Sequence, residues 1–400
     1  MRKALPVSVT GMGCVCAAGL SLPECLKALD TGVRAPKKPT RFANGHAKIY
    51  PVFELPEAFF CMRKIQKPEI SVTVRMALRA AHEALAQAGL PAQQTAGPRI
   101  GVCIGTSVGA SLNFPDFYRA HREGNSPELG PIHRYLASNP ALAVAKELGA
   151  TGPVQTIVNA CSSGADAIGM AASWIRQGLC DVVIAGGADE LSEVTYNGFV
   201  RLMITDEAPC RPFDQTRKGL NLGEAAGMLV LESEKFKTER GAHELGTLLG
   251  YGTAADAYHL TAPRPDGLGL KKAVADALAA AGLDRKDIAF INAHGTGTPN
   301  NDIAEASVFN ELFPETPFVA TKGVTGHTLG AAGAIEAIFT LNHLAEGRLP
   351  ASPGFTTPDP ELGTGPTTTP LAVAGKAAIS QSLAFGGNNS VLVVGKEGEA

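Results

Sequence analysis

The sequence predicts an α/β fold, because strand-like and helix-like segments alternate along most of the chain. Apolar runs typical of buried strands stand at residues 7–12, 99–107, 154–160 and 181–188. Between them, residues 71–90 and 163–179 carry apolar side chains at helical spacing. Strands that are joined by helices indicate parallel sheets covered on both faces, and the apolar character of these strands fits full burial.

The same pattern recurs in the second half of the chain. Strand-like runs stand at residues 226–232, 246–253, 288–295, 317–322 and 377–387. Helix-like segments stand at residues 269–283 and 330–347. A charged run at residues 233–242 is either a boundary or the solvated face of a helix or loop. We predict two similar halves, residues 1–240 and 241–400, and expect the irregular segments 33–60 and 110–140 to be insertions or caps.

Composition excludes several classes of function. The 400 residues carry a formal net charge of −3, so no global basic field would attract nucleic acid. No apolar run reaches the length of about 18 residues that a membrane-spanning helix needs. The N-terminus lacks the apolar segment of a signal peptide. Hydrophobic residues make up 45% of the chain, which predicts a large core.

The eight cysteines are scattered and mostly lie among apolar residues. A chain of this length does not need disulfide bonds to fold, so we expect reduced thiols and a cytoplasmic protein. Cys14 and Cys16 form a C-x-C pair, but no second pair follows at the spacing of a zinc site. We therefore expect no structural zinc.

Cys161 is the first candidate catalytic residue. A strand-like run ends just before it and a helical segment begins just after it, so the cysteine lies at a strand–turn–helix junction. A helix N-terminus offers unpaired N–H groups and a partial positive charge. These lower the pKa of a thiol and can stabilise an oxyanion formed on a thioester. The alternative is a buried, inert cysteine, which is our interpretation of most of the other seven.

Two histidines have a similar setting. His294 follows a strand-like run and enters a loop of glycine and threonine, and His327 follows the strand that ends near Lys322. Ligands of parallel sheets bind beyond the strand ends, and the small neighbours of both histidines let a ligand approach. Phe385 precedes two glycines, in a loop able to swing or to bring its N–H to a thioester. We interpret the other histidines as surface or core residues.

One thiol and two imidazoles from separate loops predict covalent acyl transfer. Two neutral imidazoles can each donate a hydrogen bond to one enolate oxygen, which stabilises a carbanion equivalent. This chemistry requires no metal and no organic cofactor. A cysteine hydrolase, by contrast, needs only one imidazole and usually an Asn or Asp that orients it.

With these segments the chain resembles the β-ketoacyl-ACP synthases, in the elongating branch of the thiolase-fold condensing enzymes. The resemblance spans nearly the whole chain, through VTGMG, ACSSG, AGGAD, RPFDQTRKGLNLGEAAGMLVLE, DAYHLTAP, NAHGTGTPNND, TKGVTGHTLGAAG and FGGNNS. It implies a thiolase-like, layered α-β-α-β-α fold of two similar halves, the first carrying the nucleophilic cysteine and the second the two histidines. It also implies a dimer, with substrates carried on the phosphopantetheine of acyl carrier protein.

The resemblance also assigns roles. Cys161 would take an acyl chain from acyl carrier protein, with its own N–H and that of Phe385 as the oxyanion hole. His294 and His327 would support decarboxylation of malonyl-ACP, and the enolate would attack the acyl thioester. Phe385 would also gate the site.

Further roles concern charge and substrate contact. Lys322 would balance the charge of the site with Glu336 and Glu305, although a lysine near a carboxylate is often only a solvated pair. The remaining candidates would contact substrate: Thr296 and Thr298 at the phosphopantetheine arm, and Val108 at the acyl pocket.

The sequence departs from the family pattern at several points. Asn388 stands where the usual GFGGTN has threonine, which bears on the mobility of that loop. Gly323 follows Lys322 where serine is common, and residues 33–70 are divergent. Three basic residues of that region are either a docking patch for carrier protein or an ordinary solvated face: Arg63, Lys64 and Lys67.

The sequence thus predicts an elongating ketosynthase of fatty acid biosynthesis or of a specialised polyketide or aryl polyene pathway. The alternative is a non-catalytic chain-length factor, but such partners usually lack the cysteine that stands here at 161. Thiolases use a second cysteine near the C-terminal end, whereas none follows Cys210. Starter-type synthases usually have Asn where His327 stands. We expect a homodimer, or a heterodimer with a chain-length-factor-like homologue.

Overall fold

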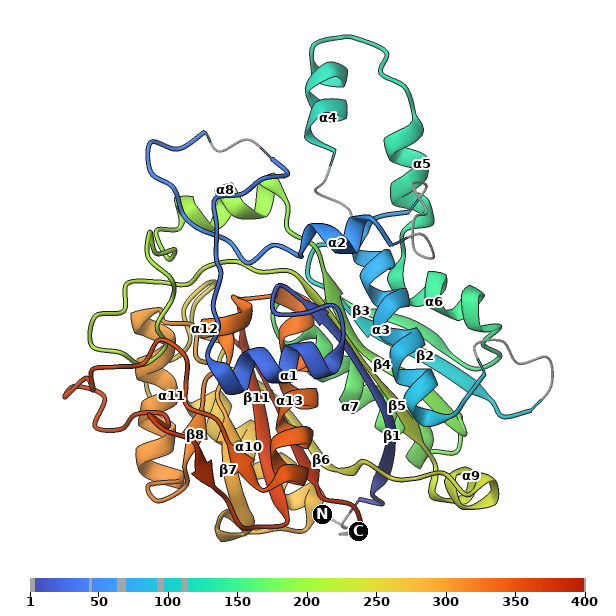
Figure 1. Cartoon of the computed structure of the whole chain (residues 1–400), viewed down its shortest axis with the longest axis vertical. Helices are drawn as coiled ribbons and strands as arrows, with labels where there is room; N and C mark the ends of the chain where they lie inside the picture. The colour runs from blue at the N-terminus through green and yellow to red at the C-terminus, as the bar shows by residue number, and fades with distance from the viewer. Residues whose placement is uncertain (1–3, 43–44, 63–69, 92–96, 110–113, 399–400) are drawn as a thin grey trace.

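The computed structural model describes residues 4–42, 45–62, 70–91, 97–109 and 114–398. Ten of its strands form one sheet in the order β3-β2-β4-β5-β1-β6-β12-β11-β7-β8 (Figure 1). The strands of this sheet are β1 (Val7–Cys16), β2 (Ile100–Gly105), β3 (Val154–Ile157), β4 (Val182–Asp189), β5 (Ala225–Glu232), β6 (Gly246–Ala255), β7 (Ile288–Asn292), β8 (Phe318–Val319), β11 (Ala377–Ala384) and β12 (Asn388–Gly395). Two short strands, β9 (Arg348–Leu349) and β10 (Leu371–Ala372), pair separately.

Helices pack on both faces of this sheet. They are α1 (Leu22–Thr31), α2 (Glu57–Phe60), α3 (Val72–Ala88), α4 (Pro115–Arg122), α5 (Gly130–Ala137), α6 (Pro140–Leu148), α7 (Ser163–Arg176), α8 (Glu193–Arg201), α9 (Glu234–Arg240), α10 (Leu268–Ala281), α11 (Pro299–Leu312), α12 (Lys322–Thr325) and α13 (Ala332–Glu346). None of the helices in the described part of the chain has both the length and the apolar character needed to cross a membrane.

The elements form five layers. One outer core holds α3 and α6 against β1, β2, β4 and β5, and the opposite outer core holds α10 and α11 against β6, β7, β11 and β12. The helices α7 and α13 lie between these two groups of strands, and they contact each other and strands of both groups. This confirms the α/β fold and the α-β-α-β-α layering that the resemblance implied.

The continuous apolar runs of the strands follow from this layering. Successive side chains of a strand point to opposite faces, so a strand covered on both sides is apolar throughout. In β4, Val183 packs in the central core with α7 and α13, whereas Val182 and Ile184 pack in the outer core with α3. Each such side chain contributes roughly 1.5–3 kcal/mol when fully buried.

The expectation of parallel sheets is wrong for the centre of the sheet. The strand β1 runs antiparallel to β5 and β6, and β4–β5, β6–β12 and β11–β12 are also antiparallel. The pairs β2–β3, β2–β4, β7–β8 and β7–β11 are parallel. A parallel connection needs about a dozen residues or more. Only residues 385–387 join β11 to β12, so this pair must be a hairpin.

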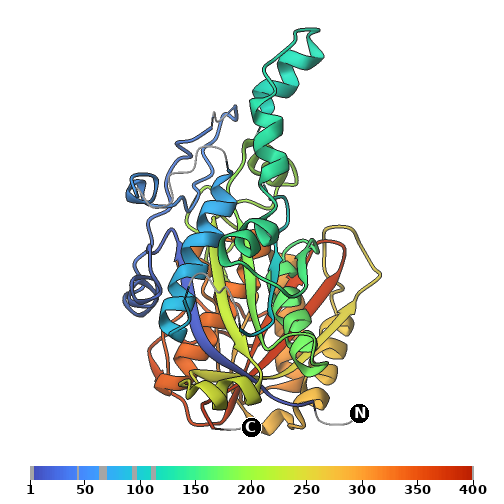
Figure 2. The ribbon, with the colours of Figure 1, turned by 90° about the vertical axis from the view of Figure 1, so that its right-hand side faces the viewer.

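The irregular and charged segments have varied structures. The charged run forms α9, a surface helix that follows β5 and precedes β6 in the chain. The division of the chain at residue 240 stays a prediction. Segment 110–140 is not wholly irregular, because α4 and α5 form an arm that projects from the body (Figures 1 and 2). The possible docking patch of Arg63, Lys64 and Lys67 lies outside the described residues.

His343, near the end of α13, gives a prediction about stability. Its side chain is buried, neither ring nitrogen has a hydrogen-bond partner in the described part of the chain, and burial lowers its pKa to about 4. A histidine in the unfolded chain has a pKa near 6.5. The folded state therefore loses stability as the pH falls from about 6.5 to 4, by about 3 kcal/mol from this group.

We expect His343→Leu to remove that loss. Urea unfolding at neutral and acidic pH measures it as a smaller acid-dependent drop in unfolding free energy than in the wild type. His133→Leu, at an exposed position, is the matched control and should behave as the wild type. An unchanged pH dependence in His343→Leu would contradict the assignment.

Candidate active site

Cys161 lies in a strained turn between β3 and α7. Ala160, just before it, has a φ of 49°, in the left-handed region that residues with a Cβ rarely adopt. Two hydrogen bonds hold the turn. The N–H of Asn159 donates to Oγ of Ser163 at 2.8 Å, and this hydroxyl donates to the carbonyl oxygen of Ala160 at 2.6 Å. The turn places Cys161 directly before the N-terminus of α7, as the sequence predicted.

A buried carboxylate in the first turn of α7 supports this junction. Asp166 accepts hydrogen bonds from Nδ2 of Asn159 at 2.6 Å, from Oγ of Ser162 at 2.8 Å and from the hydroxyl of Tyr251 at 2.8 Å. Ser390 also donates to it. No local sequence signal marks this network, because Tyr251 and Ser390 come from β6 and β12.

The N-terminal ends of α7 and α13 meet through glycines. A Cβ at Gly164 would lie 2.7 Å from the carbonyl oxygen of Gly330, and a Cβ at Gly330 would lie 2.5 Å from the backbone nitrogen of Ser107. His327 precedes α13 and is held by the backbone, because its N–H donates to the carbonyl of Asn221 at 2.8 Å. This close approach of two helices brings the Cys161 and His327 segments together.

The thiol and the two imidazoles that the sequence singled out share one cavity. Nε2 of His327 lies 3.1 Å from Sγ of Cys161, and the ring centroids of His294 and His327 are 5.2 Å apart with the planes at 87°. All three side chains are buried. They line a cavity of about 390 Å³ together with Thr296, Thr298 and Phe385.

Both histidines are neutral at neutral pH. Burial, together with the positive charge of Lys322, lowers the pKa of each imidazole well below 6.5. Nζ of Lys322 lies 3.2 Å from Nδ1 of His294 and donates to the carbonyl oxygen of His294 at 2.5 Å. An ammonium group has only donors, so Nδ1 accepts and the hydrogen of His294 lies on Nε2.

Two carboxylates accompany these groups. Glu336 forms a buried ion pair with Lys322, and burial raises the pKa of Glu336 to about 7 although the lysine opposes this. Glu305 accepts the backbone N–H groups of His294 and Gly295, each at 2.7 Å, so it fixes the His294 loop. Burial raises the pKa of Glu305, and the charge of Lys322 acts in the opposite direction.

The expectation of a lowered thiol pKa at Cys161 is contradicted. Burial raises the pKa of this thiol to about 12, against the opposing effects of the Lys322 charge and of a hydrogen bond from the backbone N–H of Phe385. The resting sulfur is therefore protonated at neutral pH. The turn alone suggested a thiolate, whereas the burial that decides the protonation state arises only from the tertiary packing.

Aromatic rings form one wall of the cavity. Phe385 stacks on Phe199 with centroids 5.4 Å apart and planes at 13°, and Phe199 meets the ring of His327 edge-on at 6.5 Å. Phe199 comes from α8, and no local sequence signal links it to the site. Nδ2 of Asn388 donates a hydrogen bond to the carbonyl oxygen of Phe385 at 3.3 Å. Asn388, which stands where the family usually has threonine, therefore restrains the loop of Phe385.

Val108 does not lie among the residues that line the cavity. Its loop is held by Asp189, a buried carboxylate that accepts the backbone N–H groups of Ser107 at 2.6 Å, Gly109 at 3.1 Å and Gly330 at 2.7 Å. The loop thus packs behind the Cys161 turn, and the role of Val108 in bounding an acyl pocket stays a prediction.

Gly323, the second departure from the family pattern, has a steric cause. A Cβ at this position would lie 1.9 Å from the carbonyl oxygen of Pro353. We expect Gly323→Ser to lower the unfolding free energy by about 1–3 kcal/mol, because the backbone must move to relieve the clash. Gly198→Ser is the matched control, because a Cβ there has open space. Equal urea midpoints for the two variants would contradict this explanation.

Comparisons with known proteins agree with the geometry. The family model for the N-terminal domain of β-ketoacyl synthases matches residues 4–236, and the model for the C-terminal domain matches residues 245–356. The 3-oxoacyl-[acyl-carrier-protein] synthase 2 of Staphylococcus aureus (strain MRSA252) is 33% identical over an alignment of 418 positions, which covers 99% of each chain.

Solved structures are similar over the same length. The ishigamide ketosynthase/chain length factor superposes with a TM-score of 0.90 at 29% identity, over 99% of this chain and 100% of the other. A ketosynthase bound to a hexaketide, in complex with its type II polyketide acyl-carrier protein, gives a TM-score of 0.87 at 27% identity over 98% and 100%.

Proposed function

Since the chain belongs to the β-ketoacyl synthase family, we propose that Cys161 carries the acyl group in its condensation reaction. The enzyme is an elongating 3-oxoacyl-[acyl-carrier-protein] synthase, which joins an acyl thioester to malonyl-ACP with loss of carbon dioxide. One observation carries the residue assignment. The Cys161 sulfur lies 3.1 Å from Nε2 of His327, in a cavity that His294 also lines.

The first step transfers the acyl group to Cys161. The sulfur attacks the thioester carbonyl while its proton moves to Nε2 of His327, the acceptor within hydrogen-bond reach. The backbone N–H of Phe385, which is directed at the sulfur, stabilises the oxyanion together with the N–H of Cys161. The carbon–sulfur bond to phosphopantetheine then breaks, and the departing thiolate takes the proton.

The second step uses both imidazoles as hydrogen-bond donors. Once Cys161 is acylated, the neutral ring of His327 exchanges its Nδ1 hydrogen through solvent for one on Nε2, so that Nε2–H of His327 joins Nε2–H of His294 at the thioester oxygen of malonyl-ACP. Carbon dioxide leaves, and the enolate carbon attacks the acyl carbonyl. The Cys161 thiolate departs and takes the Nε2 proton of His327, and Nδ1 of His327 takes one proton from solvent, which restores the resting enzyme. No metal or organic cofactor enters this scheme.

A labelled-substrate assay tests the proposal. The purified chain, given radiolabelled malonyl-ACP and an acyl-ACP, should form 3-oxoacyl-ACP and release one carbon dioxide for each product. Release of free acid without a new carbon–carbon bond would instead indicate the hydrolase alternative. Absence of both reactions in the folded chain would favour a chain-length factor.

We also propose that the chain works as a dimer and binds acyl carrier protein. Edge strand β3 supports the dimer, because Val154 and the following Val158 are exposed, the latter to 67%. Lys218 of this chain lies at the cavity, where its basic side chain would meet the phosphate of the carrier protein's phosphopantetheine. The free thiols of all eight cysteines support a cytoplasmic location.

Purification from the native host, with mass measurement, tests the dimer. A complex of twice the chain mass would show a homodimer, and a complex with a second related chain would show pairing with a chain-length-factor-like homologue. A single chain at micromolar concentration would contradict the dimer. Substitution of Val154 by lysine should weaken either dimer, because the charge would be placed on the exposed edge.

A further inference from the structure

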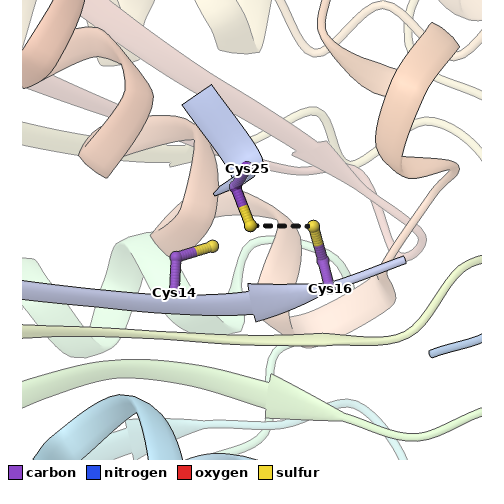
Figure 3. Close-up of side chains that lie close together, drawn as sticks. All are labelled: Cys14, Cys16 and Cys25. Atoms are coloured by element: carbon purple, nitrogen blue, oxygen red, sulfur yellow. Dashed lines mark hydrogen bonds between the residues drawn. The ribbon is translucent and has the colours of Figure 1, made fainter. Parts of the chain in front are cut away.

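Three buried cysteines, none of which lines the reaction cavity, converge in the core (Figure 3). Cys14 and Cys16 lie two positions apart on β1 and so point to the same face of the strand. Cys25 comes from the first half of α1. All three sulfur atoms lie within 4.8 Å of one another, and those of Cys16 and Cys25 are 3.5 Å apart. The sequence showed only the C-x-C pair, because the third sulfur arrives through tertiary packing.

The backbone around the cluster is tightly held. Cys16 and Gly19 exchange backbone hydrogen bonds of 2.9 and 3.2 Å, which close the turn between β1 and α1. The carboxylate of Glu83, from α3, accepts the N–H of Cys14 at 3.0 Å and the N–H of Leu22 at 2.9 Å. One side chain thus joins the strand to the first residue of the helix. The three sulfurs are positioned by these contacts before any ligand arrives.

We propose that Cys14, Cys16 and Cys25 form a three-coordinate site for a soft monovalent cation, with Cu(I) as the natural occupant. Metal–sulfur bonds of about 2.3 Å around a trigonal centre place the sulfurs about 4 Å apart. The observed sulfur–sulfur distances, which are 3.5 Å for Cys16 and Cys25 and at most 4.8 Å for the other two pairs, lie around this value. Thiolates are the ligands that select Cu(I), and each coordinating thiol gives up its proton to solvent.

The ligand set argues against zinc. Structural zinc takes four ligands, whereas no fourth His, Cys, Asp or Glu joins the group within the described residues. All three cysteines are fully buried in the central core, which keeps bulk water away from their sulfur atoms. Cys161 is not a member, so occupancy of this site is separate from acyl transfer.

An anaerobic Cu(I) titration against the chelator bicinchoninate tests the site. The background variant Cys61→Ser/Cys161→Ala removes the exposed thiol and the reaction-site thiol. We expect it to bind one Cu(I) per chain, with a higher thermal midpoint and with three sulfur neighbours by X-ray absorption. Cys16→Ala in this background should weaken binding by more than about tenfold and remove the thermal shift.

Two further variants complete the design. Cys103→Ala in the same background removes another buried cysteine, outside the cluster, and should leave Cu(I) binding unchanged. Cys16→Ala with Cys161 intact should still condense substrates, which shows that the variant folds. If bicinchoninate retains all the Cu(I), if Cys16→Ala and Cys25→Ala both bind as tightly as the background, or if Zn(II) is preferred, the proposal is overturned.

Discussion

Cys161→Ala should abolish condensation while malonyl-ACP is still decarboxylated. The variant removes the sulfur that carries the acyl group, so the rate of 3-oxoacyl-ACP formation should fall by at least about a thousandfold. His294 and His327 remain, and their Nε2–H groups still stabilise the enolate oxygen. Labelled substrates measure the two reactions separately, one as 3-oxoacyl-ACP and the other as carbon dioxide.

Cys103→Ala is the matched control. Cys103 is buried in β2, and burial raises the pKa of its thiol to about 12, as for Cys161, but Cys103 does not line the reaction cavity. The control should condense at a rate close to that of the wild type. If Cys161→Ala condensed normally, the nucleophile assignment would be wrong. If it lost decarboxylation as well as condensation, Cys161 would be a structural residue of the site.

The comparison of these two cysteines shows what the sequence could and could not predict. Cys161, His294 and His327 are recognisable because each comes after a strand-like run and has small neighbours, which is a local signal. In the folded chain the short helix α12 stands between β8 and His327. The protonation state of Cys161 is not recognisable, because it depends on burial by distant segments. The same limit applies to Phe199 and Tyr251, whose contacts with the site exist only in the folded chain.

The fold divides in a similar way. Periodicity indicated most strands and helices, because a layer covered on both sides requires continuous apolar runs. It did not reveal strand direction, which depends on connection length. The three residues between β11 and β12 were interpreted as a functional loop, and they are also the hairpin turn that makes this pair antiparallel. Phe385 therefore has its position fixed by the same turn that defines the sheet.

Lys322→Met should destabilise the protein and slow decarboxylation. Lys322 and Glu336 are each about 1% exposed, so removal of the ammonium leaves a buried carboxyl group without its partner. We expect the unfolding free energy to fall by about 3–5 kcal/mol. His294 also loses the hydrogen bond that Lys322 donates to its Nδ1, so nothing then holds the ring hydrogen on Nε2. Decarboxylation should fall by about a hundredfold or more.

The double variant Lys322→Met/Glu336→Leu separates these two effects. Replacement of a whole buried ion pair by apolar side chains is often neutral for stability, so urea unfolding should show most of the lost free energy restored. Decarboxylation should stay low, because nothing then fixes the tautomer of His294. If activity returned together with stability, the ion pair would serve only folding. If stability did not return, packing around Lys322 would outweigh the unpaired carboxyl group as the cause of the loss.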